Sequence, residues 1–268
     1  MGIARKIVSI MEKRDLRRAV KRAQFGLSYC AVELESGEAG VAYSFPRKDS
    51  GPSMKAGGNP IGGTPALEAA RFLGSENLFD SAIGLAAVNA LVAAATSAVF
   101  SAEKTAEEAQ SSGDSGDVLE ALDLREGDRV CMVGCFFPVL EKLRQKRVEV
   151  QAVDLESKPG ALPAESVSAL LPESQVALIT ATAVINGTIE GLLELAGNCR
   201  EVAVLGPSTP LIPRAFVGTP VSCLAGIRVD DADEVFRVIG EGGGFRDFKR
   251  YTTKVTLRVP AAERFTSK

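Results

Sequence analysis

The sequence predicts an α/β protein in which a doubly wound parallel sheet follows a smaller α+β unit. Short apolar runs alternate with helical segments over residues 129–239, as in parallel strands covered on both faces. The first half instead holds a hairpin-like pair of strands and a long alanine-rich helix. Between the halves, SSGDSGD at 111–117 is small, polar and glycine-containing, as linkers are. We therefore divide the chain into residues 1–112 and 113–268.

The first unit is expected to be helix, hairpin, loop and helices. Gly37 lies between the two strands, where a hairpin turn needs positive φ. Residues 46–64 form a Gly- and Pro-rich loop, long enough to be mobile or functional. The expected helices and strands are Ile3–Ala23, Ser28–Leu34, Gly40–Phe45, Pro65–Leu73 and Asp80–Ala102.

The second unit is expected to be Rossmann-like, because right-handed crossovers between its strands place helices on both faces of one sheet. Its expected strands are Arg129–Val133, Val148–Val153, Val176–Thr180, Glu201–Leu205 and Val221–Ile227. Its expected helices are Val139–Lys146, Thr188–Ala196 and Ala232–Ile239.

Composition excludes several classes of function. The chain has no histidine, which excludes Ser-His-Asp and Cys-His catalysis and imidazole metal ligands. The net charge is −3 and tryptophan is absent, so we expect no nucleic-acid partner. Basic residues between Arg14 and Arg22 are interpreted as a solvated helix face.

The uncharged stretch Ser81–Ala102 is about long enough to span a bilayer, but alanine is only weakly apolar, so we expect a buried helix and no membrane partner. This helix could be buried within its own unit or shared with a second subunit, which leaves a homo-oligomer open. No signal peptide is evident and the five cysteines are scattered, which favours reduced thiols in the cytoplasm.

Doubly wound sheets bind ligands at the carboxyl ends of their strands. Small and polar residues follow four of the expected strands. The candidate ligand-binding residues on this edge are Gly134, Phe137, Asp154, Thr182, Asn186, Gly206, Ser208 and Thr209. In the first unit, Glu33 at a strand end and Asn89 in an apolar helix are further candidates for the opposite wall of a cleft.

The stretch from Arg129 to Glu156 begins like a dinucleotide-binding unit. Gly134 permits a tight turn, and Asp154 follows at the spacing of a ribose-binding carboxylate. The turn reads GCFFP, however, without a second or third glycine, and Pro138 donates no N–H to a phosphate. We expect a nucleoside-like or other small ligand rather than a dinucleotide.

Several candidates have structural alternatives. Asn186 or Thr188 could cap the helix that follows, and the GPSTP turn at 206–210 could simply be rigid. The acidic residues 230–234 are expected to cap a helix, through Asp231 and Glu234, rather than to bind a cation.

Among the thiols, Cys131 is expected in the core. Cys135 lies in the ligand-side loop and is the candidate metal ligand. On a continuing strand these two would be about 13 Å apart, too far to share an ion.

The chain resembles the putative heavy-metal-chelation family, whose members join an enolase N-terminal-like domain to a Rossmann-like domain. The resemblance is carried by VELESGEAGVAYSF, SAIGLAAVNAL, the turn from Gly134 to Pro138, ITATAVINGTIEGLLELA and VLGPSTPL. It implies binding of a metal or a metal-related small-molecule cofactor, such as an organic metal ligand, in a cleft between the two domains. The alternative is a Rossmann-type lyase or transferase acting on a nucleoside-like or cofactor-precursor ligand, with Asp154 or Glu33 as base.

Overall fold

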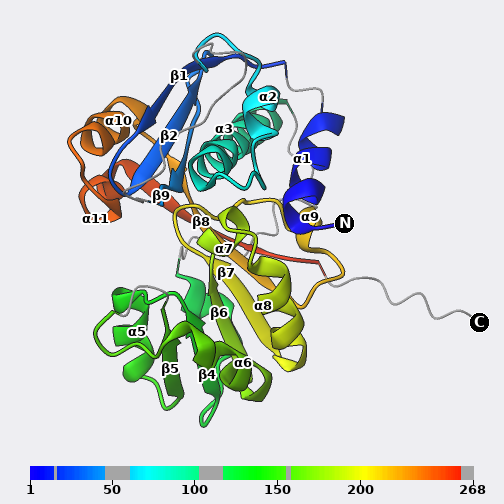
Figure 1. The fold of residues 1–268 in the computed structure, drawn as a ribbon, viewed down its shortest axis with the longest axis vertical. Coiled ribbons are helices and arrows are strands. Elements are labelled where there is room, and N and C mark those ends of the chain that lie inside the picture. Colours follow the sequence, from blue (N-terminus) through cyan, green and yellow to red (C-terminus); the bar gives the residue numbers. More distant parts are fainter. Residues whose placement is uncertain (15–16, 46–60, 103–116, 155–157, 261–268) are drawn as a thin grey trace, which may run out of the picture.

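A computed structural model gives the fold of the chain as two stacked units (Figure 1). It describes residues 1–14, 17–45, 61–102, 117–154 and 158–260. The N-terminal unit consists of α1 (Ile3–Lys13), β1 (Val20–Phe25), β2 (Tyr29–Leu34), β3 (Ala39–Tyr43), α2 (Ala66–Ala70) and α3 (Leu78–Ala102). Residues 46–60 of the expected long loop lie outside the described residues.

The three strands of this unit form an antiparallel sheet in the order β1-β2-β3. The predicted hairpin is confirmed: Val32 of β2 pairs with Gly40 of β3, and Gly37 in the turn has a φ of 99°.

The predicted helix over Ile3–Ala23 is wrong beyond Lys13, because Val20–Phe25 forms the edge strand β1. Helix α1 buries Ile3, Ile7 and Met11 at helical spacing, which is the pattern the sequence showed. Strand β1 gains its hydrogen bonds from β2, the next strand along the chain, with Phe25 paired to Cys30. Pairing with the adjacent strand β2, rather than the local pattern of charges, therefore decides the structure of this segment.

Helix α3 is the centre of the N-terminal core. A Cβ atom on Gly40 of β3 would lie 2.8 Å from the carbonyl carbon of Asn89, in the backbone of α3. A Cβ on Gly84 of α3 would lie 2.8 Å from the carbonyl carbon of Phe72, in the turn after α2. Both glycines therefore permit contacts between backbones that a side chain would prevent. Over Leu78–Thr96 the helix is apolar and long enough to cross a membrane, but 72% of that window is buried within the protein, as in a core helix.

The C-terminal unit contains α4 (Val118–Ala121), β4 (Arg129–Val133), α5 (Phe137–Arg144), β5 (Glu149–Val153), α6 (Val167–Leu170), β6 (Val176–Thr180), α7 (Thr182–Ile185), α8 (Ile189–Leu195), β7 (Glu201–Leu205), α9 (Pro213–Phe216), β8 (Cys223–Val229), α10 (Ala232–Gly240), α11 (Phe245–Phe248) and β9 (Thr252–Arg258). Four short 3₁₀ turns lie between these elements: Ala164–Ser166, Leu171–Glu173, Ala196–Asn198 and Lys249–Tyr251.

The six strands of this unit form one sheet in the order β5-β4-β6-β7-β8-β9. The first five are parallel and β9 is antiparallel to β8. The predicted mixed α/β fold with a mostly parallel sheet is confirmed. Its five parallel strands follow the order 2-1-3-4-5, so the topological switch point lies between β4 and β6. Strand β9 was not predicted, because its sequence, TTKVTLR, contains two cationic residues and only two large apolar residues.

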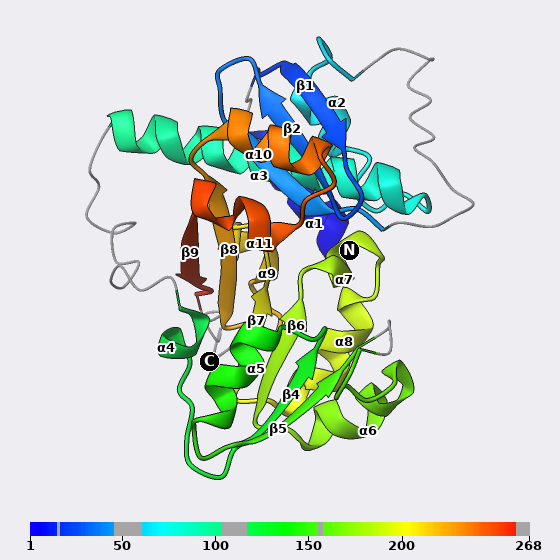
Figure 2. The same cartoon turned by 90° about the vertical axis from the view of Figure 1, so that its left-hand side faces the viewer.

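Helices cover both faces of this sheet (Figure 2). Val130 and Met132 of β4 pack in one cluster with α4 and α5, whereas Cys131 between them joins the cluster on the other face. This alternation buries each strand on both sides and accounts for the continuous apolar runs in the sequence.

The two units also share structure. Helix α10 comes from the C-terminal half of the chain, yet it covers the second face of the N-terminal sheet, where Phe236 and Ile239 pack with Ala31 and Val41. The predicted boundary near residue 112 lies outside the described residues. One face of the N-terminal sheet is therefore covered by a helix that lies on the C-terminal side of the predicted boundary.

We predict that Gly40→Ala destabilises the fold by about 2–3 kcal/mol or more, because the new methyl group must push α3 away from β3. Gly191→Ala in α8 is the matched control, since nothing lies within 4 Å of its added Cβ. This control should be neutral or stabilise by up to about 1 kcal/mol through helix propensity. Urea unfolding measures both variants, and equal stability of Gly40→Ala and wild type would contradict the tight crossing.

Candidate functional site

The carboxyl ends of β4, β6 and β7 point toward the N-terminal unit, with α7 beside them (Figure 1). Gly134 follows β4 with a φ of 89°, and its N–H donates to Val153 O at 2.8 Å. A Cβ on Gly134 would lie 2.8 Å from Cβ of Thr180, at the end of β6. Glycine thus lets the turn after β4 close directly onto β6, at the switch point of the sheet.

The ring of Phe136 lies across this switch point. Atoms of the ring would be 3.4 Å from a Cβ on Gly134 and 3.4 Å from a Cβ on Gly206, which follows β7. Since β6 lies between β4 and β7, the ring covers the end of β6. Sequence reasoning chose Phe137 instead, which is 41% exposed and begins α5. Pro138 was the signal that could have separated the two, because proline favours the first turn of a helix and so places Phe137 in that helix.

Asp154 is buried and holds the turn after β4. One carboxylate oxygen accepts the N–H of Cys135 at 2.7 Å and the ammonium of Lys158 at 3.0 Å. The carboxylate thus orders the GCFFP turn and has a cationic neighbour that the sequence analysis did not identify. A charge-assisted bond to a backbone N–H is among the stronger hydrogen bonds in proteins.

Threonine and asparagine side chains follow β6. The hydroxyls of Thr180 and Thr182 lie 2.9 Å apart. Further along, Oδ1 of Asn186 accepts the hydroxyl of Thr188 at 2.7 Å. Thr188 occupies the N-cap position of α8, but its side chain makes no capping bond. Asn186 orders the loop before α8 and remains partly exposed.

The turn at 206–210 joins the two units. Ser208 and Thr209 are each 2% exposed. The Ser208 hydroxyl accepts the N–H of Tyr43 at 2.8 Å, and its carbonyl accepts Nδ2 of Asn89 at 3.3 Å. Asn89 Nδ2 also reaches Val41 O at 3.0 Å. The structure therefore brings together two candidate residues from opposite units, Asn89 and Ser208. The hydroxyl and the carbonyl of Ser208 both bond to the N-terminal unit.

Thr209 has a purely local arrangement, with its hydroxyl 2.8 Å from Gly206 O and 2.9 Å from Ala225 O.

Glu33 lies elsewhere. It shares with Ala31 the face of β2 that α10 covers, and it forms ion pairs with Lys21 and Arg22. Arg22 also pairs with Asp233 at the start of α10. This network binds β1 to β2 and to α10. Asp231 caps the same helix by accepting the N–H of Glu234 at 3.1 Å, as expected from the sequence.

Burial disfavours the charged form of the cysteine thiols in this fold. Burial raises the pKa of Cys30 and of Cys131 to about 12, and of Cys199 and Cys223 to about 11. Burial, and then the charge of Asp154, also raise the pKa of Cys135. Metals bind the thiolate, which these environments disfavour.

Nor do ligands gather around any thiol. Within the described ranges, no group of three or more Cys, Asp or Glu side chains could hold a metal ion. Cys135 has Asp154 nearby, but that carboxylate already binds Lys158. A bare heavy-metal ion would therefore find no cluster of three such side chains among the described residues.

Comparisons with known proteins identify the family. A family model described as "Putative heavy-metal chelation" matches residues 117–258, and a second model with the same description matches residues 10–92. The chain belongs to this heavy-metal-chelation family. An uncharacterized protein of Methanocaldococcus jannaschii is 24% identical over 190 residues, which cover 69% of this chain and 68% of that protein.

Two solved structures of members of the heavy-metal-chelation family (DUF364) share the fold. The protein from Desulfitobacterium hafniense is 23% identical with a TM-score of 0.77, covering 95% of this chain and 98% of that one. The protein from Pyrococcus horikoshii is 23% identical with a TM-score of 0.78, covering 96% and 100%. At this level of identity the comparison shows a shared fold, and the shared fold includes both units of this chain.

The raised thiol pKa values predict a pH dependence of stability. The pKa of Cys30 rises from 9.0 to about 12 on folding. Its protonated form therefore stabilises the fold fully below pH 9, and this contribution is lost as the pH rises from about 9 to about 12.

Urea unfolding from pH 8 to 11 checks this prediction with Cys30→Ala. The wild type should lose up to about 1.4 kcal/mol per pH unit more than the variant above pH 9. Parallel curves for the two proteins would show that Cys30 does not keep its proton through burial.

Proposed function

We propose that this protein binds a small organic molecule that carries a metal or serves as its ligand, where the carboxyl edge of the six-stranded sheet faces the N-terminal unit. The observation that carries the proposal is the position of the switch point. The ring of Phe136 lies beside the turns after β4 and β7, Gly134 lies against Thr180 at the end of β6, and the turn after β7 also contacts the N-terminal unit through Ser208. Both units thus supply the surroundings of the edge where ligands of this fold class bind.

The family description supports a connection to metals, while the side chains favour a metal bound within an organic ligand. A bare soft metal needs several thiolates or imidazoles. This chain has no histidine, four of its five cysteines are buried, and all five thiols have raised pKa values. A metal that arrives with its own ligand needs only contacts to that organic molecule.

The wall offered at the switch point suits an uncharged, flat part of such a molecule. Phe136 supplies an aromatic ring beside two glycine backbones, and Thr180 and Thr182 supply hydroxyls. The charge of Asp154 is matched by Lys158. Apolar surface with a few fixed polar groups is the usual composition of a small-molecule site.

The contacts of Asp154 give no specific support to the enzyme alternative. A general base needs to reach the proton that it abstracts, whereas this carboxylate is engaged by Cys135 and Lys158.

Thermal-shift and native mass-spectrometric measurements test the proposal. The probes are Zn²⁺, Ni²⁺ and Cd²⁺ as chlorides, and the same ions as phenanthroline complexes. We expect the complexes to bind and raise the melting temperature, and the simple salts to have no effect.

Thr182→Val is the test variant, with Thr96→Val as the matched control on an exposed turn of α3. Loss of one hydrogen bond should weaken binding of a complex about threefold to tenfold in Thr182→Val. The control should bind as the wild type does. Stoichiometric binding of the simple ions, or equal binding of complexes by both variants, would overturn the proposal.

A further inference from the structure

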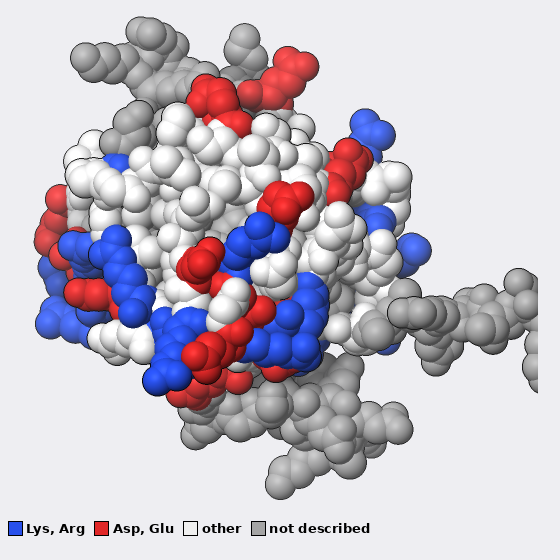
Figure 3. Space-filling model, turned by 90° about the horizontal axis from the view of Figure 1, so that it is seen from below, with Lys and Arg blue, Asp and Glu red and all other residues white. Residues whose placement is uncertain are grey.

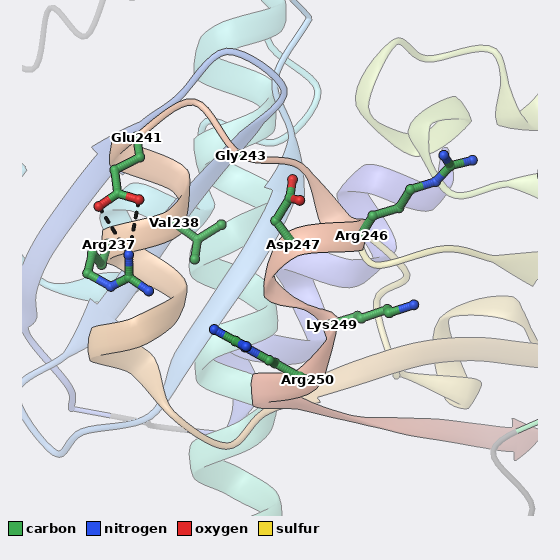
Figure 4. A pocket seen from close by; sticks show the side chains of 8 residues that line it. All are labelled: Arg237, Val238, Glu241, Gly243, Arg246, Asp247, Lys249 and Arg250. Carbon is green, nitrogen blue, oxygen red and sulfur yellow. Dashed lines mark hydrogen bonds and ion pairs between the residues drawn. The ribbon is translucent and has the colours of Figure 1, made fainter.

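A cavity of about 530 Å³ lies between α10 and α11, away from the switch point (Figure 4). It shares no residue with the candidate site on the carboxyl edge. Its volume falls in the range of small-molecule sites. Val238 of α10 forms an apolar wall, and Gly243 lies in the loop that closes one end.

The cavity keeps a fixed shape because both sides are anchored. Phe248 of α11 is fully buried, and its ring packs against Tyr29 with centroids 5.2 Å apart. A Cβ on Gly243 would lie 3.0 Å from the carbonyl oxygen of Val238, so the loop presses directly against α10. A site that needs little rearrangement loses less free energy on binding.

Positive charge exceeds negative charge around this cavity. Its lining side chains include four cations, Arg237, Arg246, Lys249 and Arg250, and two carboxylates, Glu241 and Asp247. Arg237 is neutralised, because it bonds to Glu241 at 3.0 Å and to Glu234 at 2.8 Å. Asp247 accepts the N–H of Gly244 at 2.8 Å.

The other three cations have no carboxylate within ion-pair distance in the part of the chain that the structure describes. Arg250 donates to the Tyr251 hydroxyl at 2.6 Å and stacks on that ring, and its side chain points toward α10 (Figure 4). Arg246 and Lys249 point outward on the other side of α11 (Figure 4).

Some basic residues elsewhere are paired with carboxylates. At the amino ends of β4 and β5, Arg129 pairs with Glu173 and Arg147 with Glu126. Blue and red side chains lie next to each other on the described part of that face (Figure 3). Among the described residues, three of the four cations lining the α10–α11 cavity therefore lack an ion-pair partner, although the charge of Arg250 also acts on Glu234.

We propose that the α10–α11 cavity binds a small polyanion bearing a phosphate or several carboxylates, with Arg250 contacting the anionic group. Lys249 and Arg246 at the rim raise the local concentration of anions. Guanidinium groups suit these ligands because they donate parallel hydrogen bonds to two oxygens of one anionic group.

Isothermal titration calorimetry with pyrophosphate and with citrate tests this proposal and distinguishes the two kinds of anion. We expect at least one to bind wild type with a Kd below about 1 mM, corresponding to about −4 kcal/mol. The double variant Lys249→Gln/Arg250→Gln should bind at least tenfold more weakly. Lys13→Gln/Arg14→Gln at the exposed end of α1 changes the charge equally and should bind within twofold of wild type.

Glu241→Gln should change the affinity for the anion in the opposite direction. It removes a carboxylate from the lining and releases one partner of Arg237, so binding should tighten about threefold. Local unfolding cannot produce a tighter complex. Absence of binding to both anions, equal weakening in the two double variants, or no tightening in Glu241→Gln would overturn the proposal.

Discussion

The crossing of α3 over β3 at Gly40 is the contact on which the arrangement of both units depends. Only a glycine allows the helix backbone to approach the strand so closely. That approach places Asn89 where its amide reaches Val41 O and Ser208 O. Near the start of α3, the Ser81 hydroxyl donates to Ile185 O at 2.7 Å, at the end of α7. One buried helix therefore contacts the loops after both β6 and β7.

This arrangement explains why the turn at 206–210 is rich in polar groups without offering them to a ligand. Ser208 bonds to the N-terminal unit and Thr209 bonds within its own unit, so each hydroxyl meets a buried partner. Buried hydroxyls need such partners, since an unpaired one costs free energy. The groups at the switch point include the two glycines, the Phe136 ring and the Thr180 and Thr182 hydroxyls, with Asp154 and its partner Lys158 beside the turn after β4. The chemistry proposed for this edge follows from that short and largely uncharged set.

The charges of the molecule are concentrated elsewhere. Glu33 and Arg22 bind β1 to its neighbours, and Asp154 with Lys158 orders the turn after β4. Around α11 the cationic side chains outnumber the carboxylates. Phe245 and Phe248 of this helix pack toward the core, and the charged residues of FRDFKR line the cavity. The heavy-metal-chelation family description and the described side chains are compatible if any metal enters within an organic molecule. The two proposed sites would then differ in kind, one nearly neutral and one basic.

The sequence by itself determined the mixed α/β fold, the five parallel strands, the hairpin at Gly37 and the absence of histidine chemistry, because each rests on local pattern or composition. Tertiary structure decided the rest. The basic residues up to Arg22 suggested a helix, whereas pairing with the adjacent strand β2 makes Val20–Phe25 a strand. Helix α10 covers a sheet from the other half of the chain. Pro138 indicates that Phe137 begins α5, but only the tertiary structure shows that the turn directs the ring of Phe136 toward Gly206. The partners of Asp154, Ser208 and Glu33 were equally invisible, since long-range contacts determine whether a polar side chain faces a ligand or joins the protein to itself.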